Sequence, residues 1–309
     1  MGDRPGFVRD PHPARTPGLG SGTPVLPRAA APGRRLPAHR VGTGPARRHH
    51  RRGGLTVTSI IAVANASGSA GKTTTVVTLA DLIGQTRRVV VVDADAQGTA
   101  TSWLGYPPDE VQITLGDVLL RRASLDEALL PTRTTGVRLV PSNRTLDAAA
   151  IELNSVIGRE QRLRLALTGI DADVVLIDCP GSVSTITISA LVAANAILTV
   201  TQPTMKEIAG VPEMLDAVQA VQEAFNPNLV FAGIVPCIVP PATHGKIYSD
   251  VMGLLHTTYQ PLVAPPVRRS ARVAEAHAQA VPLPSWSPTD KVTGDYHDVH
   301  DWLKGRGVL

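Results

Sequence analysis

The sequence has few cysteines and few aromatic residues, and it contains no long apolar run. Its 309 residues include two cysteines, too few for a disulfide framework or for a four-cysteine zinc or iron–sulfur site within one chain. Aromatic residues make up 3%, so the core has to be built from Ala, Val, Ile and Leu. No stretch approaches the roughly 20 apolar residues that a membrane helix needs, and the N-terminus lacks the apolar centre of a secretory signal. These absences predict a cytoplasmic protein without a membrane segment.

Positive charge is concentrated in the first 54 residues. This segment contains eleven arginines, no lysine and only two acidic residues, whereas the remainder of the chain has a net charge of −5. It also contains nine prolines and ten glycines, and such a composition buries too little apolar surface to offset the conformational entropy of the chain. We expect residues 1–56 to be either a disordered leader or sequence upstream of the true start of translation. The alternative interpretation is a basic arm that binds nucleic acid.

From residue 57 onward, short apolar runs alternate with helical patterns. Lys72–Gly84 and Lys206–Phe225 carry apolar residues at helical spacing. The runs expected to form strands are Ser59–Asn65, Arg88–Asp93, Val137–Pro141, Asp173–Asp178, Ala196–Gln202 and Val230–Cys237. Strands that are apolar on both faces and alternate with helices are typical of a parallel sheet covered on both sides. The sequence therefore predicts one doubly wound α/β domain with a mostly parallel sheet over residues 57–309.

The segment ANASGSAGKTTT, residues 64–75, joins the first expected strand to the first expected helix. Gly68 and Gly71 permit positive φ and let the backbone approach a ligand closely. Successive N–H groups and the helix N-terminus then form an anion site suited to phosphates. Lys72 can reach the β- and γ-phosphates of a nucleotide, and the Thr73 hydroxyl can join a Mg²⁺ shell. The chain has only five lysines, so a lysine at this point is informative.

Two other interpretations of this loop are a plain glycine-rich turn and the nucleophile elbow of a hydrolase. The elbow would place Ser69 as the nucleophile, but the sequence SGSAG is one glycine short of that motif and no particular histidine is indicated as its base. The phosphate loop is favoured because it follows an expected strand and opens an expected helix.

Acidic residues end two of the expected strands. Asp178 closes DVVLID, and Asp93 and Asp95 follow RVVVV. The carboxyl ends of parallel strands meet at one edge of the sheet, where a carboxylate can hold Mg²⁺ through water. Each aspartate alone is compatible with an ordinary turn. Three of them at the edge that carries the phosphate loop favour a Mg²⁺-nucleotide site.

Three segments also carry the motifs of one known family. NASGSAGKTTT, VVVVDADAQGTAT and VVLIDCPGS stand in an order and spacing that resemble the ParA/MinD branch of P-loop ATPases, specifically ParA-type partition proteins, over about residues 58–305. The resemblance implies a P-loop NTPase domain that uses ATP and Mg²⁺ and dimerises with ATP. It further implies non-specific, ATP-dependent DNA binding, a nucleoid-associated location, and a ParB-like partner that stimulates slow hydrolysis in plasmid or chromosome partition.

The resemblance implies roles for individual residues. Lys72 and Asp95 would be catalytic, Asp95 by polarising the attacking water. Nucleotide would be held by Gly68, Ser69, Ala70, Gly71, Lys72, Thr73 and Thr74. Mg²⁺ would be held by Thr73, Asp178 and Asp93. DNA would be contacted by Arg268, Arg269 and Arg272, although a solvated helix start is the alternative for these arginines.

The sequence departs from the family pattern at four positions. The lysine that reaches across the family's dimer is replaced by Ser67, and the second loop glycine by Ser69. Two prolines of the acidic motifs are replaced by Ala96 and Gly181. Because a serine cannot deliver a cation to developing phosphate charge, we expect a slow or differently regulated switch.

Two further functions are compatible with the same motifs. One is a regulatory or scaffolding protein that binds nucleotide with little hydrolysis, and the other is an ATP-dependent metabolic enzyme, such as a synthetase, on the same fold. A membrane-bound relative is disfavoured because the C-terminal segment Asp298–Leu309 is too short and too mixed in charge for a basic amphipathic helix. Cys179 and Cys237 are expected to be buried apolar side chains.

Overall fold

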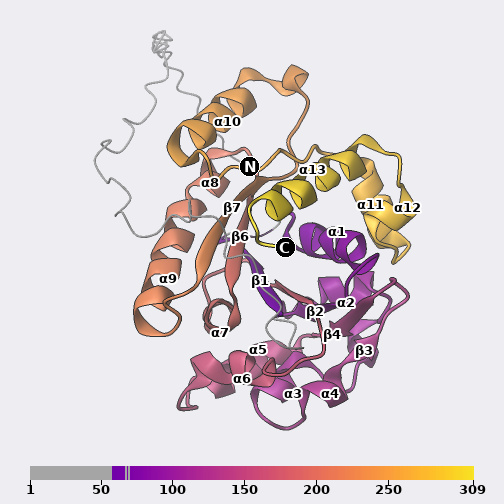
Figure 1. The fold of residues 1–309 in the computed structure, drawn as a ribbon, viewed down its shortest axis with the longest axis vertical. Coiled ribbons are helices and arrows are strands. Elements are labelled where there is room, and N and C mark those ends of the chain that lie inside the picture. Colours follow the sequence, from indigo (N-terminus) through magenta and orange to yellow (C-terminus); the bar gives the residue numbers. More distant parts are fainter. Residues whose placement is uncertain (1–57, 67, 69) are drawn as a thin grey trace, which may run out of the picture. The chain divides into compact units, whose positions relative to one another are not determined.

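In the computed structural model, residues 58–66, 68 and 70–309 are described, and seven strands form a single sheet in that part of the chain (Figure 1). The expected leader, residues 1–56, lies outside the described residues, as does its boundary with the domain. The strand order is β3-β4-β2-β5-β1-β6-β7. The strands are β1 (Ser59–Ala64), β2 (Val89–Asp93), β3 (Leu130–Pro131), β4 (Val137–Val140), β5 (Val174–Asp178), β6 (Ala196–Thr201) and β7 (Val230–Pro236).

All neighbouring strands are parallel except β3, which pairs antiparallel with β4 at one edge. The predicted mostly parallel sheet is confirmed, with each expected strand present to within a residue or two at its ends. The two-residue strand β3 was not predicted, because Leu130–Pro131 is too short to show a period.

Helices cover both faces of the sheet (Figure 1). One face packs against α3 (Leu115–Leu119), α4 (Leu125–Ala128), α5 (Thr145–Leu153), α6 (Arg162–Ala166), α7 (Thr185–Ala193) and α9 (Gly210–Ala224). The other packs against α1 (Lys72–Gly84), α2 (Thr99–Trp103), α11 (Ala271–Ala278), α12 (Leu283–Trp286) and α13 (Lys291–Gly305). Near β7, α8 (Met205–Ile208) and α10 (Lys246–Tyr259) share a smaller cluster with the start of α9. Single 3₁₀ turns are η1 (Pro108–Glu110), η2 (Arg159–Gln161) and η3 (Ala242–His244).

The strand sequences read as continuous apolar runs because their side chains are divided between two cores. In β2, Val90 and Val92 belong to the core on the α7 and α9 side, whereas Val89 and Val91 belong to the core under α1 and α13. All four are essentially inaccessible to solvent. Burial on both faces is what a parallel sheet covered by helices requires.

The helix predicted over Lys206–Phe225 is divided in the structure. Its first turn is α8, and a break at Ala209 separates it from α9. Pro212 lacks an N–H, so it cannot donate to the carbonyl of Ile208, and the helical ladder cannot run through this point. The helix predicted over Lys72–Gly84 is confirmed with the same bounds.

None of the helices in residues 58–66, 68 and 70–309 combines the length and the apolar character needed to cross a bilayer.

Candidate nucleotide site

The loop between β1 and α1 ends in a glycine that the backbone geometry requires. Gly71 is the N-cap of α1 and has φ 96°, in the left-handed region that favours glycine. A Cβ at Gly71 would lie 3.3 Å from the Cβ of Cys237 on the strand side, so the space beneath the loop is also closed. The Thr75 hydroxyl donates to the Gly71 carbonyl at 2.9 Å. The loop therefore ends at the N-terminus of α1, where the N–H groups of a helix can meet an anion.

Lys72 and Thr73 occupy the first turn of α1. Lys72 is 7% exposed, and the Thr73 hydroxyl donates to Oδ2 of Asp178 at 2.7 Å. The other carboxylate oxygen of Asp178, Oδ1, is buried and has no hydrogen-bond partner among the described residues. A buried carboxylate oxygen without a partner, beside a threonine hydroxyl, fits the shell of a hard divalent cation. The structure therefore brings together two of the three residues predicted to hold Mg²⁺.

The environment of Asp178 disfavours its charge. Burial, together with the nearby carboxylate of Asp93, raises the pKa of Asp178 well above its usual range, while the Thr73 hydrogen bond and Lys72 oppose the shift. A cation bound at this point would reverse the shift, because it stabilises the ionised form.

Asp93 lies beside Asp178, paired with it in register across β2 and β5. Its Oδ2 accepts the backbone N–H and the hydroxyl of Thr101 at 2.8 and 2.7 Å, and its Oδ1 accepts the N–H of Asp95 at 3.2 Å. Burial raises the pKa of Asp93 to about 6 despite these bonds. Both oxygens are thus already engaged in holding α2 and the Asp95 turn. The geometry shows that Asp93 positions Thr101 and the turn at Asp95. Its role as a Mg²⁺ ligand stays a prediction.

The remaining predicted nucleotide contacts fall around the same edge. Asp95 is half-buried and accepts the N–H of Gln97 at 3.0 Å, which orders the turn after β2. Ala70 is fully buried, Thr74 is half-buried and Gly68 is exposed. Ser67 and Ser69 lie outside the described residues, so the replacement of the family's lysine by Ser67 stays a prediction.

A layer of polar side chains beneath the loop was missed by sequence reasoning. The Thr75 hydroxyl lies 3.3 Å from the hydroxyl of Tyr296 and 3.7 Å from Sγ of Cys237. All three side chains are buried, and burial raises the pKa of the Cys237 thiol to about 11. Cys179 is also buried, which confirms the expectation for both cysteines. No local pattern marks Tyr296, which is more than 200 residues away in sequence from Thr75.

The three arginines predicted to contact DNA differ in their surroundings. Arg268 donates to both carboxylate oxygens of Asp295, at 2.6 and 2.7 Å, and Asp295 is largely buried. Arg272 pairs with Glu275 at 2.6 Å. Arg269 is exposed and makes no ion pair with any described residue. Of the three, Arg269 presents its guanidinium most freely to a partner, whereas Arg268 ties the segment to α13.

Comparison with known proteins identifies the family. Residues 58–231 match the family described as AAA domain. The chromosome partitioning protein ParA of Myxococcus xanthus is 32% identical over 237 residues, covering 75% of this chain and 83% of that protein. The chain belongs to the ParA family of P-loop ATPases. An uncharacterized protein of Mycobacterium tuberculosis is 33% identical to this ParA-family chain over 290 residues, covering 92% of the chain and 85% of that protein.

A solved structure from another functional class is also similar. Cobyrinic acid a,c-diamide synthase from Mycobacterium smegmatis, with bound ADP and magnesium, superposes with a TM-score of 0.69 and 32% identity, covering 79% of this chain and 93% of that one. The predicted P-loop NTPase fold is confirmed. The family of the chain and its likeness to the synthase do not by themselves distinguish a partition ATPase from a synthase. That distinction has to come from the residues of the site.

The two buried aspartates should respond to substitution in opposite ways. Asp178→Asn removes a carboxylate whose burial disfavours its charge, so the protein without nucleotide and Mg²⁺ should keep or raise its Tm. Asp93→Ala leaves the two donors of Thr101 and the N–H of Asp95 without an acceptor and should cost about 1–3 kcal/mol of stability. Thermal and urea denaturation of both variants at neutral pH measure this difference. Equal destabilisation by the two substitutions would contradict the assignment of distinct roles.

Proposed function

We propose that this chain is a Mg²⁺-dependent ATPase that acts as a ParA-like switch. The observation that carries the proposal is the 2.7 Å hydrogen bond from Thr73, in the first turn of α1, to Asp178, at the end of β5. It places a hydroxyl and a buried, partly unpaired carboxylate at the helix N-terminus where nucleotide phosphates would bind. A similar structure, the mycobacterial synthase, holds ADP and magnesium.

Each residue of the site has a distinct part in this proposal. The N–H groups of Gly68–Thr74 cradle the phosphates, and Lys72 neutralises the charge of the β- and γ-phosphates. Thr73 and Asp178 hold Mg²⁺, directly or through water, with Asp93 behind them. Mg²⁺ supplies charge neutralisation at the transferred phosphate. Asp95, half-buried in the turn that follows β2, orients the attacking water.

ATP binding is coupled in this proposal to dimerisation, to non-specific DNA binding on the nucleoid and to a ParB-like partner that stimulates hydrolysis. Similarity to ParA of Myxococcus xanthus supports these couplings. Ser67 in place of the cross-dimer lysine removes one cation from the transition state, so unstimulated hydrolysis is slow. With very little hydrolysis at the same site, the chain would act as a nucleotide-binding regulator, which is the alternative function.

A second candidate function is ATP-dependent synthesis. It is favoured by the 32% identity to cobyrinic acid a,c-diamide synthase over 79% of this chain. The two functions share the nucleotide site and differ in what ATP turnover depends on. Turnover that requires cobyrinic acid and an amide donor, and is indifferent to DNA and to a ParB-like protein, would assign the chain to synthesis.

The first prediction from the proposed function concerns the phosphate-binding lysine. Lys72→Ala should weaken ATP affinity by about 1.5–3 kcal/mol, because a charge-assisted contact to the triphosphate is lost. Lys246→Ala, at an exposed lysine of α10, is the matched control and should bind ATP like the parent. Calorimetric titration with ATP and Mg²⁺ measures both. Unchanged affinity in Lys72→Ala would exclude the phosphate loop.

The second prediction separates binding from chemistry. Asp95→Ala should retain Mg²⁺-ATP binding and lose turnover, because the proposed contact with water matters only when the water attacks. Release of phosphate, measured beside calorimetric binding, tests it. Hydrolysis at the parent rate would remove Asp95 from the catalytic residues.

The third prediction concerns DNA. Binding should require ATP, and Arg269→Ala should weaken it and lower the slope of log affinity against log salt concentration by about 1, as expected for one lost phosphate contact. Arg272→Ala should have a smaller effect because Arg272 is already paired with Glu275. Co-sedimentation at two salt concentrations, with and without ATP, measures these effects. Binding that is the same without ATP would contradict the proposed switch.

A further inference from the structure

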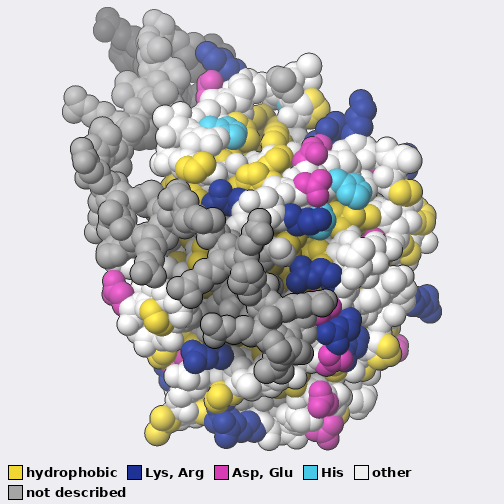
Figure 2. Space-filling model, viewed as in Figure 1, with side chains coloured by type: hydrophobic (Ala, Val, Ile, Leu, Met, Phe, Trp, Pro, Cys, Tyr) yellow, Lys and Arg dark blue, Asp and Glu magenta, His cyan; other side chains and the backbone are white. Residues whose placement is uncertain are grey.

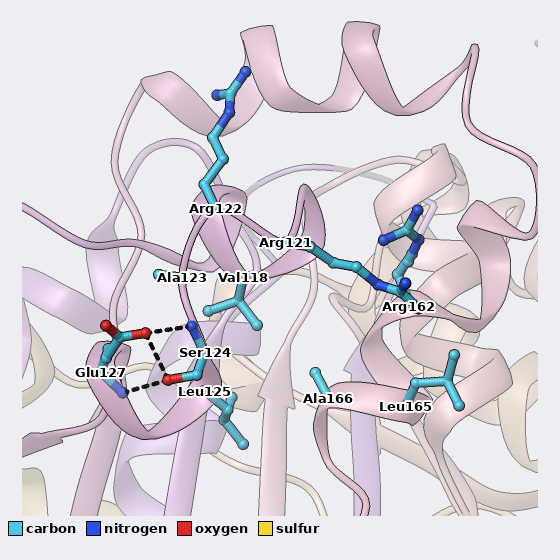
Figure 3. A pocket seen from close by; sticks show the side chains of 10 residues that line it. All are labelled: Val118, Arg121, Arg122, Ala123, Ser124, Leu125, Glu127, Arg162, Leu165 and Ala166. Atoms are coloured by element: carbon cyan, nitrogen blue, oxygen red, sulfur yellow. Dashed lines mark hydrogen bonds between the residues drawn. The ribbon is translucent and has the colours of Figure 1, made fainter.

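A pocket of about 540 Å³ lies between the turn that joins α3 to α4 and helix α6 (Figure 3). None of its lining residues belongs to the nucleotide site. Its volume is within the range of about 300–1,000 Å³ that is typical of small-molecule sites. Three arginines line it, Arg121 and Arg122 from the turn after α3 and Arg162 from the first position of α6. Arg121 and Arg162 are the two candidate ligand-binding residues, because Arg122 is paired with Glu152. Figure 3 shows the side chain of Arg121 extended toward α6, away from Glu127.

Neither arginine has a counter-ion among the described residues. The ion pairs of this region are made by others, Arg122 with Glu152 at 2.6 Å and Arg159 with Glu160 at 3.2 Å. The Nη1 atom of Arg162 is buried and has no hydrogen-bond partner within residues 58–66, 68 and 70–309. A buried guanidinium nitrogen without an acceptor is costly, and an oxyanion would satisfy it.

The acidic side chain that lines the pocket is already engaged. The Oε2 atom of Glu127 accepts both the N–H and the hydroxyl of Ser124 at 2.7 Å, forming the capping box of α4. These bonds lower the pKa of Glu127 and keep its carboxylate at the helix start. Glu127 stays ionised and offsets part of the positive charge of the pocket, but it forms no ion pair with Arg121 or Arg162, so the pocket stays net positive.

The backbone at Arg121 gives an independent argument. The N–H of Arg121 donates to the carbonyl of Val118, and the N–H of Arg122 donates to that of Asp117, which is the Schellman pattern that ends a helix. Arg121 stands at the position where this pattern favours glycine, with φ 61°. An arginine in this conformation is less favourable than glycine, so Arg121 lowers local stability relative to a glycine at the same position.

Apolar side chains form another part of the pocket wall, beside the polar side chains of Arg122 and Ser124. Val118 and Leu125 are buried at its base, and Leu165 is 54% exposed at its edge. Two guanidinium groups above an apolar wall suit a ligand that has a doubly charged oxyanion at one end and an apolar body at the other.

We propose that this pocket is a second ligand site, distinct from the nucleotide site, that binds a small organic phosphate through Arg121 and Arg162. The proposal goes beyond the ATPase function and does not depend on it. The phosphate oxygens bridge the two guanidinium groups, and the organic body lies on Val118, Leu125 and Leu165.

Calorimetric titration with phenyl phosphate tests the proposal, using the full chain and, beside it, the Lys72→Ala variant, in which phosphate binding at the nucleotide site should be weakened and binding at this pocket should be unchanged. Phenyl phosphate should bind more tightly than inorganic phosphate, because only the former buries an apolar group. Arg121→Gly and Arg162→Gln should each weaken binding at least about tenfold. Arg164→Gln, on the same helix but not lining the pocket, is the control and should bind like the parent.

Arg121→Gly is also the variant that separates binding from folding. Glycine suits the backbone at this position, so the Tm should stay the same or rise while binding is lost. Parent-like binding by Arg121→Gly, or equal affinity for inorganic phosphate and phenyl phosphate, would overturn the proposal. Binding of a glutamate-rich peptide without binding of phenyl phosphate would overturn it as well, in favour of a protein partner.

Discussion

The crowding of carboxylates at the carboxyl edge of the sheet is the constraint on which the site depends. Parallel pairing puts Asp93 and Asp178 opposite one another at the ends of β2 and β5, and both are buried. Two like charges in such a place disfavour each other's ionisation. Hydrogen-bond donors surround the two carboxylates. Thr101 and the N–H of Asp95 donate to Asp93, and the hydroxyl of Thr73 donates to Asp178. One oxygen of Asp178 has no hydrogen-bond partner among the described residues, and this is the atom at which we propose that a cation binds.

Helix α13 connects this edge to a distant part of the chain. Two successive residues of the helix face different partners, Asp295 binding Arg268 and Tyr296 lying 3.3 Å from the hydroxyl of Thr75 under the loop. In Figure 1, α13 lies beside α1 on the same face of the sheet. The segment that carries the predicted DNA-contacting arginines is thus one helix away from the phosphate loop.

At two positions the local arrangement is unfavourable for the stability of the fold. Asp178 is buried at a cost to its charge, and Arg121 occupies a left-handed position that glycine would fit better. By contrast, Asp93 accepts hydrogen bonds from Thr101 and Arg268 donates two hydrogen bonds to Asp295, so each of these residues holds two segments of the chain together. A fold shared by partition ATPases and a synthase makes these distinctions between individual side chains more informative than the fold itself.

The sequence by itself determined the parallel sheet, the bounds of α1 and the phosphate loop, because each depends on periodicity or spacing within a few residues. It also placed Thr73 and Asp178 at one edge, since parallel strands end together. Only the tertiary structure decided which polar groups are paired. It assigned Asp93 to Thr101, Arg268 to Asp295 and Tyr296 to the underside of the loop, and it left Arg121 and Arg162 facing one pocket. The physical reason is that a hydrogen bond or ion pair depends on distances between side chains that are often far apart in the chain, and no local pattern records those distances.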